Sequence, residues 1–306
     1  MPSFHVERSI RIEAPLETVR PLVRDFRQWP RWSPWLVAEP ETKLEFSDDG
    51  RSYSWDGRIT GAGSLTLDDE APASLKHTIR FLRPFRSTSK VGFTFKEDGG
   101  ATTVTWTMSG SLPFFLFFMK SMMAAWIGSD YQRGLLMLKD LAEAGEVLSK
   151  IEFQGVEEVA AIDYVGIRNG HACSNIGPEV RRDFEKLGDW LSSNSLVPSG
   201  PMFMICHKWD LVRDRAECTC AVPLAASPDP LPDGFHTGTT PAGRAYVLLH
   251  TGAYRHLGNA WAAGMMRSRG KEFRSLRGVA PMEIYRNTPG DTPEAELVAE
   301  IRMPAR

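Results

Sequence analysis

The sequence is poor in cysteine and in net charge, and each shortage excludes a class of protein. All four cysteines lie in the second half of the chain: Cys173, Cys206, Cys218 and Cys220. So few thiols, with no signal-peptide pattern over residues 1–15, favour a cytoplasmic protein over a disulfide-rich secreted scaffold. The formal net charge is only −2, and residues 1–150 carry as many acidic as basic side chains. No large basic surface for nucleic acid is therefore expected.

Long apolar runs are also scarce. The one candidate, residues 112–127, is interrupted by Lys120 and falls short of the roughly 20 apolar residues that a spanning helix needs. We therefore expect no membrane span, and interpret this run as a buried helix or a lid over a pocket.

The familiar motifs of several enzyme classes are missing. The sequence has no phosphate-binding loop, no Gly-x-Ser-x-Gly elbow and no His-Glu-x-x-His helix. The pair Gly61-x-Gly63 lacks the third glycine of a dinucleotide fingerprint and precedes a strand pattern, so it is interpreted as a turn. We expect no cofactor.

The first half mixes helices and strands in a simple order, which predicts an α+β fold. Apolar residues alternate with polar ones over residues 4–13, as in a strand with one solvated face. A helix is expected from Pro15 to near Trp29-Pro30, six strands between residues 42 and 108, and a long helix over 113–148. The turn signals between the strands favour an antiparallel meander.

This order resembles the SRPBCC superfamily, the START-like polyketide cyclase and lipid-transfer group. The likeness covers residues 1–148 and rests on the segment Phe26-x-x-Trp29-x-x-Trp32-x-Pro34-Trp35 and on Gly134-Leu135-x-x-Leu138-Lys139. It implies a helix-grip domain whose curved sheet encloses an apolar cavity. The aromatic residues could line such a cavity or simply fill a core, and His77 could be a core histidine or a ligand contact.

The second half carries an internal repeat. Tyr164-Val165 and Tyr246-Val247, each followed by a glycine, recur at an offset of 82, and the Pro-Met pairs at 201 and 281 recur at an offset of 80. Each copy reads strand, helix, strand, strand, which predicts a pseudo-twofold duplicated β-α-β-β domain with a groove between its halves. We expect this domain over residues 156–306 and a linker over 149–155.

The second half also resembles the GyrI-like effector-binding domain shared with AraC-type and MerR-type regulators. Three segments carry the likeness: a His-x-Gly-x-Tyr-like turn over 250–254, the Glu-x-Tyr strand at 283–285 and a final strand that ends at Pro304. The resemblance implies a ligand pocket with a glutamate at the strand position of Glu283.

Glu283 has the clearest chemical implication. At the offset of 80 it stands where the first copy has Phe203. A carboxylate among apolar groups is costly, so it either keeps a proton with a raised pKa or binds a cation. Glu283 and Tyr285 would share one strand face. The alternative, in which Glu283 faces solvent or pairs with Arg286 or Arg302, stays open.

Aromatic and imidazole side chains are expected around this carboxylate, where ring faces attract cations. The expected ligand-binding set is Glu283, Tyr285, Tyr164, Tyr246, Trp261, Phe203 and His250. In an enzyme, Glu283 would be the catalytic base, and Tyr285 or Tyr246 the proton donor. Cys218-x-Cys220 beside Cys206-His207 invites a zinc interpretation, but cysteines within strands are commonly small core residues, so no metal is expected.

Three functions remain open. The first is a binding protein for hydrophobic or cationic aromatic small molecules, which it sequesters, senses or detoxifies; direct nucleic-acid binding is not expected, because residues 1–150 lack a helix-turn-helix reader. The second, implied by the resemblance, is a hydrolase that opens strained cyclopropanoid genotoxins. In the third, residues 1–150 carry the main activity. The sequence fixes neither the ligand nor the oligomeric state.

Overall fold

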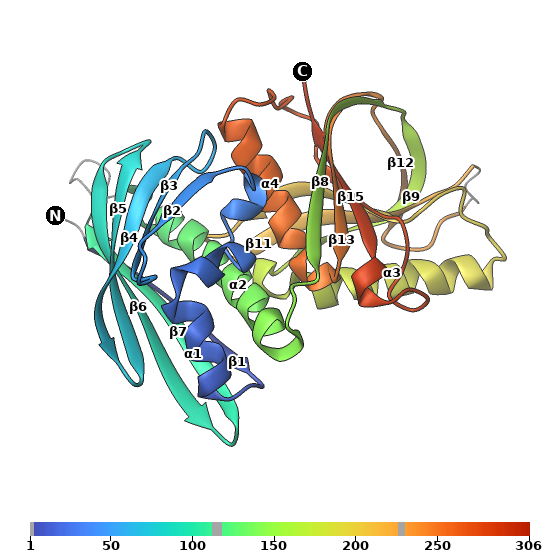
Figure 1. Ribbon diagram of the computed structural model, residues 1–306. Helices are drawn as coiled ribbons and strands as arrows, with labels where there is room; N and C mark the ends of the chain where they lie inside the picture. Colours follow the sequence, from blue (N-terminus) through green and yellow to red (C-terminus); the bar gives the residue numbers. More distant parts are fainter. Residues whose placement is uncertain (1–2, 112–117, 226–229) are drawn as a thin grey trace. The chain divides into compact units, whose positions relative to one another are not determined.

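The computed structural model describes residues 3–111, 118–225 and 230–306, which divide into two compact units (Figure 1). Unit 1 is residues 1–148 and unit 2 is residues 149–306. Each contains one antiparallel sheet and a few helices, which confirms the α+β prediction. In the described part of the chain, no helix is long and apolar enough to cross a membrane. Of the apolar run, positions 112–117 lie outside the described residues.

Unit 1 is built on a seven-stranded sheet in the order β1-β7-β6-β5-β4-β3-β2. Its strands are β1 Ser3–Ile12, β2 Lys43–Phe46, β3 Ser52–Asp56, β4 Ala62–Ala71, β5 Ser74–Arg83, β6 Ser87–Asp98 and β7 Ala101–Ser111. Strands β2 to β7 follow one another as the expected meander, and β1 lies at the edge of the sheet, where it pairs with β7.

The helices of unit 1 pack on this sheet. They are α1 Leu16–Arg24, the 3₁₀ helices η1 Phe26–Arg31 and η2 Leu36–Ala38, and the long α2 Lys120–Ala144. Helix α1 ends earlier than expected, because Asp25 takes an extended backbone and its carboxylate accepts the N–H of Arg27. Helix α2 ends at Gly145, whose φ of 81° is left-handed and favours glycine. Leu135 and Leu138 on α2 are fully buried in the core of unit 1.

Aromatic rings fill the centre of that core. The indole of Trp106 stacks on the ring of Tyr131 with 3.8 Å between centroids, and on Phe93 at 5.0 Å. Trp29 and Trp32 meet the same indole edge-on at 5.9 and 5.5 Å. These rings contact one another closely, which favours the core interpretation over a lining around empty space.

His77 lies inside the same aromatic cluster and is fully buried. Burial lowers its pKa to about 4, so the imidazole is neutral near pH 7. Its ring lies 5.5 Å from Phe26 and 5.8 Å from Phe93, centroid to centroid. His77 therefore packs as part of the core.

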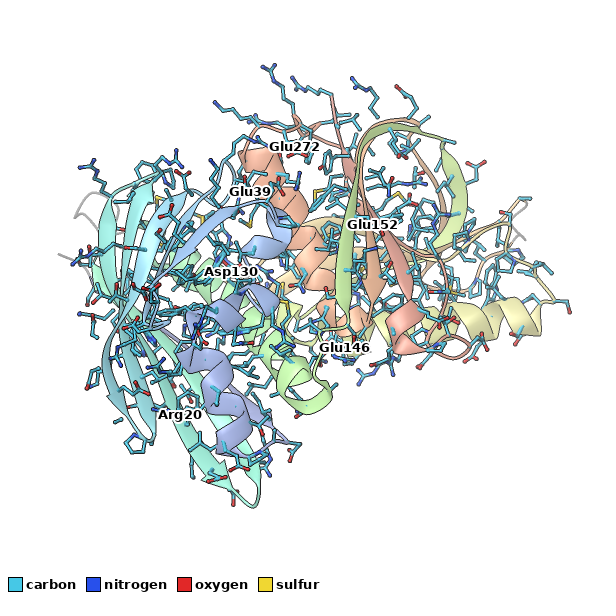
Figure 2. All side chains as sticks on the ribbon, in the orientation of Figure 1. Arg20, Glu39, Asp130, Glu146, Glu152 and Glu272 are labelled. Atoms are coloured by element: carbon cyan, nitrogen blue, oxygen red, sulfur yellow. The ribbon has the colours of Figure 1, made fainter. Side chains whose placement is uncertain are left out.

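A buried carboxylate holds together the loop that follows β3. Glu39, labelled in Figure 2, accepts the backbone N–H groups of Arg58, Ile59 and Thr60 at 2.8–2.9 Å. The hydroxyls of Thr60 and Thr42 also donate to it. Burial alone would raise the pKa of Glu39, but these hydrogen bonds outweigh burial and lower it.

Glu39→Gln should lower the free energy of unfolding by about 2 kcal/mol at pH 7, because an amide cannot accept all these donors. The lowered pKa means that the carboxylate stabilises the fold above its ordinary value of 4.5 and loses this effect as the pH falls through the folded-state pKa. Urea unfolding at pH 7 and at pH 3 measures both effects. We expect wild type and variant to differ less in their free energy of unfolding at pH 3 than at pH 7. The same difference at both pH values would contradict this role of Glu39.

Unit 2 is built on an eight-stranded sheet in the order β12-β9-β11-β10-β14-β15-β13-β8. Its strands are β8 Ser149–Val159, β9 Ile162–His171, β10 Phe203–Asp210, β11 Arg215–Pro223, β12 Phe235–Thr240, β13 Gly243–Gly252, β14 Met282–Tyr285 and β15 Val298–Pro304. Its helices are α3 Ile176–Ser193 and α4 Leu257–Arg269, with 3₁₀ helices η4 Cys173–Asn175, η5 Tyr254–His256 and η6 Glu294–Glu296.

The segment expected to be a linker belongs to strand β8. Residues 149–155 pair with β13 from Ser149 opposite Gly252 to Gly155 opposite Val247. Polar residues and glycine suggested an unstructured connection, but Ile151 alternates with polar neighbours as an edge strand requires. The linker prediction was therefore wrong, because a half-solvated edge strand has the composition of a loop.

Candidate functional site

Glu283 lies in the middle of the sheet of unit 2, on the short strand β14. In register, it is opposite Met204 on β10 and opposite Ile301 on β15. Residues paired in this way point to the same face. Glu283 is only 3% exposed, so its carboxylate is held inside the domain.

The face that carries Glu283 is the one that the helices cover. Met204 and Tyr285 belong to an apolar cluster that includes Val180, Leu187 and Leu191 of α3. Helix α4 reaches the same face through Trp261, whose indole Nε1 donates to Glu283 Oε2 at 2.5 Å. Both helices therefore pack on the face that carries the carboxylate, and α4 contacts it directly.

Burial raises the pKa of Glu283, and hydrogen bonds from Tyr285 and Trp261 oppose that rise only in part. The contact between Glu283 and Tyr285 also raises the pKa of the phenol. Burial and the neighbouring Glu283 raise the pKa of Tyr285 well above its ordinary value, so its hydroxyl stays protonated. The site thus holds a carboxyl group with a raised pKa beside a phenol that keeps its proton.

No cationic side chain of the described residues forms an ion pair with Glu283. The two arginines considered as partners, Arg286 and Arg302, both bind Glu300 instead. Glu300 is paired in register with Ile284, so it points to the opposite face of the sheet. The carboxylate of Glu283 is therefore buried without a compensating positive charge.

Two aromatic residues that were not in the expected set complete the wall around Tyr285. The ring of Tyr254 lies 5.4 Å from that of Tyr285, and the ring of Phe184 on α3 lies 5.3 Å from it. The hydroxyl of Tyr254 donates to the backbone oxygens of Asn287 and Val298. Both residues carried a sequence signal, since each marks the apolar face of a helical segment, but periodicity alone does not say which apolar residues border a ligand.

Phe203 and Tyr164 lie on the other face of the sheet. Phe203 is opposite Ile284 in register, and its ring contacts that of Tyr164 at 5.6 Å. The residue that the offset of 80 aligns with Glu283 therefore points to the opposite face, because neighbouring residues on a strand face opposite ways. A cavity of about 340 Å³ opens on that far face, with Phe203, Arg286 and Ile284 among its lining residues.

Tyr246 and His250 lie on β13 and have other partners. The hydroxyl of Tyr246 donates to Glu272 at 2.6 Å, and its ring stacks on Phe273 at 4.3 Å; Glu272 is labelled in Figure 2. Burial raises the pKa of Tyr246 to about 12. His250 is fully buried, with Nε2 3.1 Å from the hydroxyl of Ser149, and burial lowers its pKa to about 4. Of the expected set, the structure brings only Tyr285 and Trp261 into hydrogen-bond contact with Glu283.

The cysteines near the site do not form a metal centre in the described residues. Over residues 3–111, 118–225 and 230–306, no group of three or more His, Cys, Asp or Glu side chains is arranged to hold a metal ion. All four cysteines are free thiols, and Cys218 and Cys220 are buried. The groups gathered around Glu283 are the phenol of Tyr285, the indole of Trp261 and nearby thiols.

Comparisons with known families assign both halves of the chain. Residues 3–143 match the model described as polyketide cyclase / dehydrase and lipid transport. Residues 155–306 match the model described as GyrI-like small molecule binding domain. No curated protein matches the chain significantly.

Many solved structures resemble parts of the chain. The complex of EcmrR with DNA matches at a TM-score of 0.44 and 16% identity, over 63% of this chain and 69% of that one. SAV2435 bound to tetraphenylphosphonium matches at 0.41 and 16%, over 51% of this chain and 94% of that one. XoxI from Bacillus cereus matches at 0.36 and 19%, over 45% and 94%. Such low identities and TM-scores say nothing of the ligand.

Proposed function

Because residues 3–143 belong to the polyketide cyclase and lipid transport family and residues 155–306 form a GyrI-like small-molecule-binding domain, we propose that unit 2 binds bulky aromatic cations at Glu283. The observation that carries this proposal is the buried carboxylate without a cationic partner among the described residues. The protein would sequester or sense such compounds.

The energetics favour a cation as the occupant. A buried carboxylate is costly to keep ionised, and a positive charge brought into the same site offsets that cost. Trp261, Tyr285 and Tyr254 supply ring faces, which attract cations most strongly where water is excluded. The Trp261 indole donates to the carboxylate, so a ligand that pairs with Glu283 would take the place of that hydrogen bond.

The arrangement of unit 2 supports a duplicated origin for the site. Elements β9, α3, β10 and β11 follow one another in the same order as β13, α4, β14 and β15. Met204 of β10 is paired in register with Glu283 of β14, which holds the same place in the second copy. The first copy thus presents an apolar methionine on this face, and the charge would be present in one copy only.

Calorimetric titration of the full chain tests the proposal. We expect tetraphenylphosphonium to bind at least ten times more tightly than an uncharged aromatic compound of similar size, because only the cation compensates Glu283. Tetramethylammonium serves as a control that has the charge without the rings, and should bind weakly. Equal affinity for the charged and uncharged aromatic compounds would contradict a cation site.

A hydrolase is the second candidate, and the contact between Glu283 and Tyr285 is the observation that favours it. A carboxylate with a raised pKa is a suitable base for water, and a phenol that stays protonated can donate to the opened ring. Incubation with an electrophilic cyclopropanoid distinguishes the two functions. Turnover that is lost in Glu283→Gln would support the enzyme, whereas stoichiometric binding without product would support the binding protein.

A further inference from the structure

Two cysteines face each other on neighbouring strands beside the Glu283 site. Cys206 on β10 and Cys218 on β11 are partners in the antiparallel register. The backbone N–H of Cys206 donates to Pro281 O at 2.9 Å, away from β11. The two cysteines therefore form a non-hydrogen-bonded pair, in which Cα atoms are typically about 4.5 Å apart, and the register shifts directly after this pair, between Cys206 and Lys208. That separation falls within the range of about 4.4–6.8 Å that a disulfide requires.

The two thiols differ in the ways that a reactive pair requires. Cys206 is half-buried, whereas Cys218 is buried. A hydrogen bond between the thiols lowers the pKa of Cys206, although burial and the nearby Glu283 oppose this. The same hydrogen bond, together with burial, raises the pKa of Cys218. Cys206 is thus the thiol that ionises first and that an oxidant reaches first.

We propose that Cys206 and Cys218 form a redox-sensitive pair, which peroxide converts into a disulfide across β10 and β11. The Cys206 thiolate attacks one oxygen of hydrogen peroxide, the O–O bond breaks, and a sulfenic acid and one water result after proton transfer. The Cys218 sulfur then attacks the Cys206 sulfur: the S–S bond forms, the S–O bond of the sulfenic acid breaks, and its hydroxyl leaves with the Cys218 proton as a second water. One peroxide is reduced for two thiols oxidised. This modification does not depend on the identity of the ligand.

The other two cysteines, Cys173 and Cys220, are the competing partners for a disulfide. The Sγ of Cys173 donates to the backbone oxygen of Asp210 at 3.9 Å. Cys206 contributes to the raised pKa of Cys173, and Cys173 contributes to the raised pKa of Cys218. Cys220 is opposite Met204 in register rather than opposite another cysteine. Because only Cys206 and Cys218 face each other directly, oxidation should select this pair.

Peptide mapping of the full chain after treatment with hydrogen peroxide tests the pairing. Trypsin cuts after Lys208 and Arg215 and so separates the two cysteines, and without reductant the two peptides should remain linked. The link should disappear in the Cys206→Ser variant, which should fold because Cys206 is only half-buried. It should persist in the control variants Cys173→Ser and Cys220→Ser. The midpoint temperature of unfolding should rise by about 5 °C on oxidation and return with dithiothreitol.

Two results would overturn the proposal. One is a sulfinic or sulfonic acid on Cys206 without a linked peptide. The other is a link from Cys206 to Cys173, or to a second chain, in place of Cys218. Each is read in the same mass spectra as the expected product.

Discussion

Replacing Glu283 by glutamine should weaken the binding of tetraphenylphosphonium by about 100-fold. The substitution keeps the shape of the side chain and removes only its ability to carry a negative charge. Truncating one partner of a buried charge pair costs roughly 2–5 kcal/mol in binding, and each 1.4 kcal/mol is a factor of ten. The large effect follows from the 3% exposure of Glu283, which leaves little water to screen the attraction.

The matched control for this variant is Glu217→Gln. Glu217 lies on β11 of the same sheet, where its exposed carboxylate pairs with Arg168. Glu217→Gln removes the same formal charge from unit 2 as Glu283→Gln does. It should change the affinity for tetraphenylphosphonium less than threefold. A loss of similar size in both variants would mean that general charge, and not the buried carboxylate, drives binding.

The Glu283→Gln variant should fold at least as stably as the wild type near pH 7. A carboxyl group whose pKa is raised on folding destabilises the folded state at pH values above its ordinary pKa of 4.5, because the unfolded chain ionises more readily. The amide removes that penalty. A loss of affinity with unchanged or increased stability separates a binding role from a structural one.

Replacing Trp106 by alanine should lower the free energy of unfolding of unit 1 by about 3–5 kcal/mol. Trp106 is 1% exposed. Its indole contacts five other aromatic rings: Trp29, Trp32, Trp35, Phe93 and Tyr131. Since these rings hold each other in place, they cannot readily collapse into the space that the indole leaves.

The control in the same unit is Phe85→Ala. Phe85 is 81% exposed, so its truncation should change the free energy of unfolding by less than about 0.5 kcal/mol. Chemical denaturation followed by tryptophan fluorescence measures both variants. A cost under about 1 kcal/mol for Trp106→Ala would contradict a filled core and would favour aromatic residues that line an open cavity.

The elements of unit 1 followed from the sequence because local signals agree with the tertiary fold there. Alternation marked β1, and turn residues such as Gly50, Gly99 and Gly100, each with positive φ, separated the strands of the meander. The end of α1 was missed, since the capping carboxylate of Asp25 acts on the following 3₁₀ helix. A polar residue after a helical segment does not reveal which helix it caps.

The site in unit 2 could be predicted only in part, because its residues meet through strand register. The sequence singled out Glu283, Tyr285 and Trp261, but the offset of 80 aligned the carboxylate with Phe203, which the sheet places on the opposite face. A shift of one residue is small in an alignment of weakly similar copies, but it moves a side chain to the other face.

The charge of Glu283 during binding tests the central claim most directly. Titration of tetraphenylphosphonium at several pH values from 5 to 8, in buffers of different ionisation enthalpy, counts the protons released for each ligand bound. Because the pKa of Glu283 is raised, the wild type should release protons at the lower pH values, and its affinity should rise with pH and then level off. Glu283→Gln should show neither effect. Binding by the wild type with no proton release and the same affinity at every pH would contradict the account.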